Sequence, residues 1–187
     1  MPENCEAPPF IPIATSEELG DSNSWVNTTY QWPQDPYDDI CRELAQAMFA
    51  WGSVESSLFT IFATSLQSAN KDVSAATWYS LESFRARREI TDATHKNSGL
   101  AGFDEDRWKK LLERSRRRST ARNFIAHGQL FYEHTVKDPA RKFFVSIPKL
   151  DSGIDKRNYA SDIKSVKESF TTLGEDLKAY WLNLLGQ

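Results

Sequence analysis

The residues best suited to chemistry in this chain lie in one short segment, residues 116–129, which reads RRRSTARNFIAHGQ. Within it, Arg122 is followed directly by Asn123 and, five positions after the arginine, by His127. Histidine is the side chain most readily poised for proton transfer near neutral pH, and arginine is a permanent, planar cation that matches a phosphate group. The segment therefore predicts a catalytic group for phosphodiester chemistry that needs no metal ion.

These residues come at the end of a predicted amphipathic helix, residues 104–127. At 100° per residue, eight of its side chains fall within about 60° of one line: Trp108, Leu111, Leu112, Ser115, Ser119, Arg122, Asn123 and Ala126. The small side chains of Ser115, Ser119 and Ala126 would let another helix approach closely. We therefore expect this half of the helix to form a two-fold homodimer interface, which reuses one patch on both chains.

His127 is expected at the C-terminal end of that helix, one turn beyond Asn123. The carbonyl end of a helix favours a protonated imidazole and so raises its pKa. The positive charge of the nearby Arg122 acts in the opposite direction. The sequence does not show which of the two effects on the pKa of His127 is larger.

Glu55 is a candidate supporting residue because it lies between Trp51 and Leu58, on the apolar side of another predicted helix, residues 35–68. A lone buried carboxylate is costly unless a cation pairs with it. The expected partner is an arginine of helix 104–127, with Arg122 as the candidate. A purely structural ion pair is the alternative interpretation.

A basic cluster precedes the candidate catalytic group and consists of Arg114, Arg116, Arg117 and Arg118. It belongs to segment 84–122, which contains twelve basic and six acidic residues, whereas residues 1–40 contain eight acidic residues and no Lys or Arg. The net charge of −3 hides this asymmetry. The cluster is a candidate RNA-binding surface, but its side chains point all around the helix, so a solvated face is an equal alternative.

Apolar residues recur at helical spacing in four segments and predict helices near 35–68, 72–94, 104–127 and 159–185. Two short aromatic and β-branched stretches, residues 128–136 and 142–150, predict a β-hairpin. The expected fold class is mainly all-α, a four- to five-helix bundle with a short β-hairpin inserted before the last helix. Residues 1–34 are expected to form an irregular acidic arm, and residues 35–187 the helical domain.

The motif from Arg122 to His127, with Asn123 directly after the arginine at the end of a basic helix, resembles the Arg-x4-His signature of HEPN domains. The resemblance also covers FAWGSVESSLFTIF, residues 49–62, and the overall layout of residues 35–187. HEPN domains are helical bundles, and their catalytic members are metal-independent endoribonucleases that are often toxins or antiviral defence effectors. Dimers that bring two motifs together are common in the family.

This resemblance implies roles for the three residues. His127 would act as general base on the 2′-hydroxyl of RNA or as acid on the leaving 5′-oxygen. Arg122 would neutralise charge in the transition state, and Asn123 would orient His127 or bind a phosphate oxygen. The implied partners are RNA, a second copy of the chain, and an antitoxin or nucleotidyltransferase. A catalytically silent HEPN bundle that binds RNA or nucleotides, or dimerises, is the alternative.

Composition excludes several other classes of protein. Hydrophobic residues at 40% and charged residues at 26% are ordinary for a globular protein, which excludes wholesale disorder. The chain has no run of 18 apolar residues, so no membrane span is expected. Two cysteines and three scattered histidines predict neither a disulfide framework nor a metal or cofactor site. His95 and His134 lie among polar residues and receive no role. The small number of cysteines, together with an N-terminus that lacks the pattern of a signal peptide, favours a reducing, cytoplasmic compartment.

Overall fold

The computed structural model describes residues 34–68, 70–135, 138–149, 153–154 and 157–186. The expected acidic arm, residues 1–34, therefore lies outside the described residues except for Gln34, where the first helix begins. Among the described residues, no helix is both long and apolar enough to cross a membrane. The same residues contain no group of three or more His, Cys, Asp or Glu side chains arranged to hold a metal ion.

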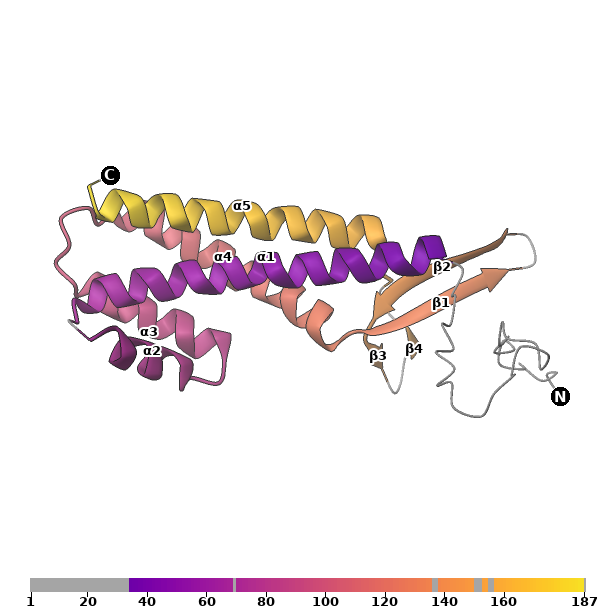
Figure 1. Ribbon diagram of the computed structural model, residues 1–187, viewed down its shortest axis with the longest axis horizontal. Coiled ribbons are helices and arrows are strands. Elements are labelled where there is room, and N and C mark those ends of the chain that lie inside the picture. Colours follow the sequence, from indigo (N-terminus) through magenta and orange to yellow (C-terminus); the bar gives the residue numbers. More distant parts are fainter. Residues whose placement is uncertain (1–33, 69, 136–137, 150–152, 155–156, 187) are drawn as a thin grey trace, which may run out of the picture.

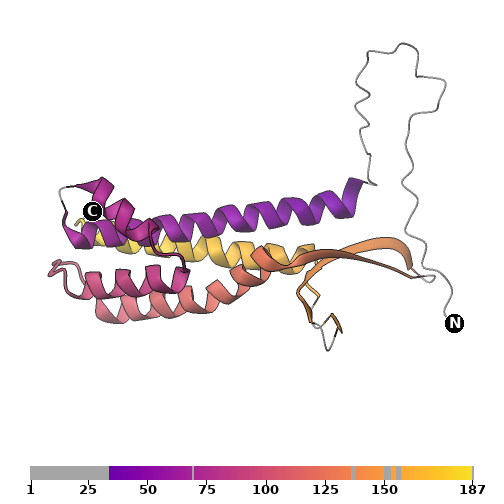
Figure 2. The same ribbon diagram turned by 90° about the horizontal axis from the view of Figure 1, so that it is seen from below.

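The described chain is mainly helical, as the sequence predicts. Its five helices are α1 (Gln34–Leu66), α2 (Lys71–Tyr79), α3 (Phe84–Lys96), α4 (Glu105–His127) and α5 (Ala160–Leu184). The helices α1 and α5 run side by side, and α3 and α4 lie behind them in Figure 1 and below them in Figure 2. Large side chains fill the space between the helices: Trp51, Trp78, Trp108, Tyr180, Phe62 and Phe170 are all at most 2% exposed.

The predicted single helix over residues 72–94 is wrong, because the structure divides it into α2 and α3. Ser83 has an extended backbone, and its side chain accepts a hydrogen bond from the Ala86 N–H, which is the geometry of an N-terminal helix cap. Helix α3 packs against α2, and the Trp78 Nε1–H of α2 donates to Thr91 Oγ1 of α3 at 3.1 Å. Apolar spacing continued across the break and concealed this cap.

The β-hairpin before the last helix is confirmed. Strands β1 (Gln129–Thr135) and β2 (Asp138–Ser146) pair antiparallel, with Gln129 opposite Ser146. The buried Phe143 and Val145 attach the hairpin to the core. A second, very short pair, β3 (Pro148–Lys149) with β4 (Gly153–Ile154), was not predicted, nor was the bridge between Val145 and Asn158.

Both ends of α4, which positions the candidate catalytic group, are well defined. At its start, Asp104 Oδ1 accepts the Arg107 N–H at 3.0 Å. At its end, Gly128 has φ −69° and ψ 150°, an extended conformation rather than the left-handed one typical of a helix-ending glycine. Close packing requires this glycine: a Cβ would lie 2.3 Å from Val145 Cγ1 and 2.8 Å from the Phe124 carbonyl oxygen. The helix therefore passes into β1 without a loop.

Candidate active site

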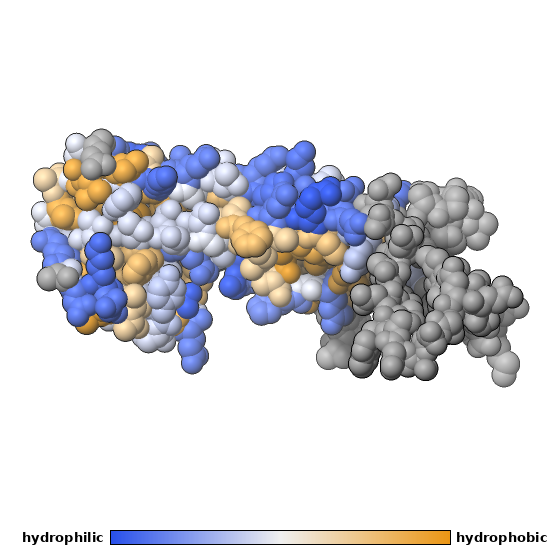
Figure 3. All heavy atoms as spheres, in the orientation of Figure 1, coloured by the Kyte–Doolittle hydropathy of each residue, from blue (hydrophilic) through white to orange (hydrophobic). Residues whose placement is uncertain are grey.

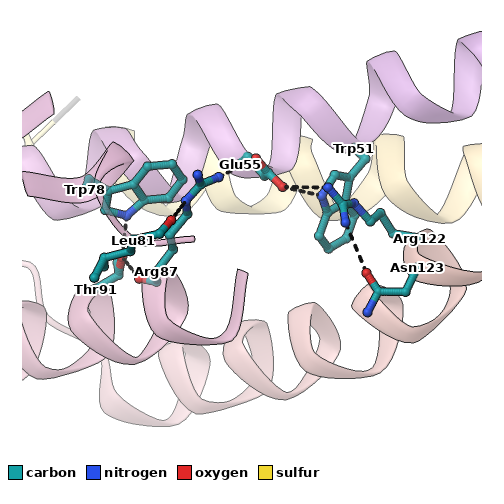
Figure 4. A network of polar contacts seen from close by, with 8 residues as sticks. All are labelled: Trp51, Glu55, Trp78, Leu81, Arg87, Thr91, Arg122 and Asn123. Atoms are coloured by element: carbon teal, nitrogen blue, oxygen red, sulfur yellow. Dashed lines mark hydrogen bonds and ion pairs between the residues drawn. The ribbon is translucent and has the colours of Figure 1, made fainter. Parts of the chain in front are cut away.

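Arg122 extends from α4 toward α1, and its side chain is 29% exposed. Its Nη1 donates to Asn123 Oδ1 at 3.1 Å, and its Nη2 lies 4.0 Å from Glu55 Oε1 (Figure 4). The remaining nitrogen, Nε, is buried and has no hydrogen-bond partner among the described residues. Buried donors without a partner are uncommon, so this guanidinium is held in position while part of its hydrogen-bonding capacity stays unused.

Glu55 connects three elements. Its Oε1 accepts the Trp51 Nε1–H at 2.7 Å, and its Oε2 accepts Arg87 Nη1 at 3.2 Å. The expected ion pair with Arg122 is present at 4.0 Å, but Arg87 of α3 is the closer cation. The Glu55 side chain is 21% exposed, so two arginines from different helices share a mostly buried carboxylate.

Sequence reasoning missed Arg87, although a signal existed. Phe84, Arg87 and Thr91 follow the inward spacing of α3, which places the arginine among core positions. Its Nε donates to the Leu81 carbonyl oxygen at 2.9 Å, and its guanidinium carbon lies 5.0 Å from the centre of the Trp78 ring. Arg87 is thereby fixed, and it orients Glu55 in turn.

Asn123 and His127 lie on the exposed side of α4. The Asn123 amide contacts Arg122, whereas no hydrogen bond or ion pair joins His127 to any other described residue. Five residues turn a helix by about 140° relative to its starting direction. Arg122 and His127 of one chain therefore point in different directions, with Arg122 turned toward α1.

The line of buried side chains along α4 differs from the predicted one in its last turns. Trp108, Leu111 and Ser115 are buried as expected, but Ile125 is buried instead of Ala126, which is exposed. The hairpin supplies the reason, since Val145 packs on Gly128 and adds apolar surface at this end. Helical periodicity considers α4 alone, so it does not predict the apolar surface that the hairpin adds.

Ser115 corrects part of the expected dimer interface. Its side chain is fully buried within its own chain, where Oγ donates to the Leu111 carbonyl oxygen at 2.8 Å. A residue without exposed surface cannot contact a second copy. Of the three small residues expected there, Ala126 is exposed and Ser119 is half-buried.

The four arginines of the basic cluster differ in how far their charge is already paired. Arg114 Nη1 donates to Asp176 of α5 at 2.5 Å. Arg116 donates twice to Glu113, at 2.8 and 2.7 Å, and these bonds lower the pKa of the Glu113 carboxyl. Arg117 lies 3.5 Å from the same carboxylate. Arg118 is exposed and forms no ion pair with the described residues, so it carries the most available positive charge.

Unused hydrogen-bonding capacity is found on α4, on the hairpin and just before α5. Three buried side-chain atoms in the described part of the chain lack a partner: Arg122 Nε, Ser146 Oγ and Asn158 Nδ2. Ser146 lies opposite Gln129, and Asn158 bridges Val145, which packs on Gly128. Sequence reasoning missed Ser146 and Asn158, because strand register alone brings them to this region.

His95, to which the sequence assigned no role among polar neighbours, is in fact a core residue. It is 1% exposed, with Nδ1 2.8 Å from Ser65 Oγ and Nε2 2.8 Å from the Tyr180 hydroxyl. Burial lowers the pKa of His95 to about 4. This imidazole is therefore neutral near pH 7 and belongs to the structural core. The side chain of His134 lies outside the described part.

Comparison with known proteins finds no matching protein family, no matching curated protein and no matching solved structure. The function is therefore inferred from the residues of the chain and from the motif they form.

Proposed function

We propose that the chain is a HEPN-type endoribonuclease that cleaves RNA without a metal ion, in the cytoplasm, as a toxin or antiviral defence effector. A toxin of this kind would be paired with an antitoxin or nucleotidyltransferase. The single observation that carries the proposal is the state of Arg122. Its guanidinium is oriented by Glu55 and Asn123, keeps a buried donor without a partner among the described residues, and belongs to a residue five positions before an exposed histidine.

His127 and Arg122 have different roles in this reaction. His127 takes the proton of the RNA 2′-hydroxyl as general base or protonates the leaving 5′-oxygen as general acid. The 2′-oxygen attacks the adjacent phosphorus, and Arg122 stabilises the negative charge that develops on the phosphoryl oxygens. The products are a 2′,3′-cyclic phosphate and a 5′-hydroxyl end. DNA has no 2′-hydroxyl and is not cleaved.

A homodimer accounts for the directions of the two side chains. Within one chain, Arg122 and His127 point about 140° apart around α4. A two-fold contact along the exposed end of α4, where Asn123 and Ala126 are accessible, would supply His127 of one copy to Arg122 of the other. Ser115 takes no part in this contact because it is buried.

The direct test is incubation of the purified full chain with RNA in excess EDTA. We expect cleavage by the wild type, none with DNA of the same sequence, and loss of activity in His127→Ala and Arg122→Ala. Thr120→Ala is the matched control, since it removes an exposed side chain from the same helix. Full activity of His127→Ala would overturn the proposed mechanism.

Mixing two inactive variants tests the shared site. A mixed dimer of Arg122→Ala and His127→Ala chains contains one site with both residues intact. Random exchange makes half of the dimers mixed, so roughly a quarter of the wild-type activity should return if the sites act independently. If both residues act within one chain, no activity returns.

One observation favours the alternative of a catalytically silent module that binds RNA or nucleotides. The Glu55 carboxylate already lies near both Arg87 and Arg122, and it offsets part of their charge. In that case RNA would bind in EDTA without being cleaved, and Arg122→Ala would weaken binding only.

A further inference from the structure

The outward side of α1 carries no charge over most of its length. From Leu44 to Leu66 the only charged side chain is Glu55, which points inward to Arg87 and Arg122. Surface helices normally place charged residues on their solvent face. Here that face exposes instead the uncharged residues Ala45, Gln46, Phe49, Gly52, Ser53 and Ser56.

Phe49 protrudes from this face. Its side chain is 79% exposed, more than any other large hydrophobic residue in the described part. Beside it, an open groove of about 600 Å³ runs between α1 and α5 and is lined by Phe49, Gly52, Ser53, Ser56, Ser57, Thr60, Lys178 and Trp181. Figure 3 shows this side of the molecule coloured by hydropathy, and pale side chains of intermediate hydropathy lie there between blue, hydrophilic groups.

We infer that this α1 face (Phe49, Gly52, Ser53, Ser56 and Ser57) binds the same face of a second copy of the chain. A two-fold axis that passes beside Gly52 and Ser53, perpendicular to α1, makes the two α1 helices antiparallel. Phe49 of each copy then lies opposite Ser56 and Ser57 of the other, so the protruding ring enters the groove. Gly52 meets Ser53 at the crossing, where small side chains let the helices approach closely.

Charge and shape both suit a second copy as the occupant. Two identical chains bring identical charges to a two-fold contact, and like charges placed opposite one another are unfavourable. None of the five residues of the α1 face is charged, so this cost is confined to Lys178 of α5, which lines the groove. The protruding Phe49 and the groove also lie on the same face, which is the arrangement that an isologous contact requires.

The α1 face is separate from the candidate active site. Glu55 and Arg122 lie on the inward side of α1, whereas Phe49 and Gly52 lie on its outward side. The contact does not complete the site and does not depend on the proposed function. If the contact at α4 also forms, the two together build assemblies larger than a dimer.

The test measures the molar mass of the full chain by light scattering. We expect Phe49→Glu and Gly52→Glu to halve the mass of the wild type at the same concentration. Neither change should affect folding, because Phe49 is exposed and a Cβ at Gly52 meets no atom within 4 Å. Val73→Glu is the matched control, since Val73 is 52% exposed on α2 and the change adds the same charge elsewhere. A monomeric wild type, or an unchanged mass of Phe49→Glu, would overturn the inference.

A cross-link tests the arrangement itself. In a chain with Cys5→Ser and Cys41→Ser, oxidation of Ser53→Cys should give a covalent dimer, because the two copies of residue 53 meet beside the axis. Val73→Cys should remain uncross-linked. A halved mass of Phe49→Glu without this cross-link would overturn the antiparallel arrangement. Both measurements are independent of RNA cleavage, so their failure would leave the proposed nuclease activity untouched.

Discussion

Two histidines at different places in the same bundle have opposite environments. His95 of α3 is enclosed by Ser65 and Tyr180, and both of its ring nitrogens lie within 2.8 Å of a hydroxyl. His127, in the last turn of α4, is exposed and forms no hydrogen bond or ion pair with the described residues. The difference indicates two roles. A buried histidine whose two ring nitrogens are both hydrogen-bonded stabilises the fold, whereas an exposed histidine at a helix end is accessible to a substrate.

Replacing His127 should give the largest effect. We expect His127→Ala to lower the rate of RNA cleavage 10²–10⁴-fold, the usual loss for a general acid or base, and to change the free energy of unfolding by less than about 0.5 kcal/mol. Cleavage assays and urea unfolding of the same preparation measure both. A large loss of stability would place His127 in the same structural class as His95.

Replacing His95 should do the reverse. His95→Ala leaves a cavity and deprives Ser65 and Tyr180 of their partner, so we expect a loss of about 2–5 kcal/mol in the free energy of unfolding. The cleavage rate per folded molecule should stay near that of the wild type. Tyr180→Phe leaves no cavity but removes two contacts of the hydroxyl, to His95 Nε2 at 2.8 Å and to the Asp104 carbonyl oxygen at 3.4 Å, and should cost about 1–2 kcal/mol. A normal stability of His95→Ala would break the comparison.

Acid should destabilise the fold through His95. Its pKa is about 4 in the folded chain and near 6.5 in an unfolded one, so the unfolded state binds the proton first. Stability is therefore lost as the pH falls from about 6.5 to about 4, by up to about 3 kcal/mol, and this contribution is constant below that range. His95→Gln should show a flatter decline over the same range in urea unfolding. Parallel curves for the two proteins would contradict the assignment.

The charge of Glu55 should have a smaller effect, on the position of Arg122. Glu55→Gln keeps an oxygen that can accept the Trp51 N–H but loses the attraction for both arginines. We expect about a 10-fold lower cleavage rate, equivalent to about 1.4 kcal/mol. Glu89→Gln is the control, because within the described part of the chain Glu89 pairs with Arg85 alone, at the surface of α3. Equal rates for Glu55→Gln and the wild type would reduce Glu55 to a structural ion pair.

The smallest effect concerns the basic cluster. Arg118→Ala should weaken RNA binding similarly for all sequences and lower the slope of log affinity against log salt by about one. Arg116→Ala should change this slope less, because Glu113 already neutralises that side chain. Binding titrations over a range of salt concentrations measure both. Equal slopes for the two variants would show that the ion pair with Glu113 opens when RNA binds.

Periodicity was enough to predict most of the fold from sequence, including the hairpin and the place of Arg122, Asn123 and His127 at one helix end. It failed where a local cap interrupted an apolar pattern, as at Ser83. It also failed where a contact depends on elements far apart in the chain. Arg87 reaches Glu55 across 32 positions, and His95 reaches Tyr180 across 85, and neither distance leaves a local pattern. Likewise, Ile125 is buried and Ala126 is exposed because the hairpin, which is distant in sequence from most of α4, packs at this end of the helix.

The junction at Gly128 has a mechanical consequence. Since no side chain fits between Phe124 and Val145, α4 and the hairpin meet with no slack, and the two must turn together. The seven residues of β1 extend about 23 Å from that junction. We therefore expect a load on the hairpin to reach the last turn of α4 and to change the direction of the His127 imidazole.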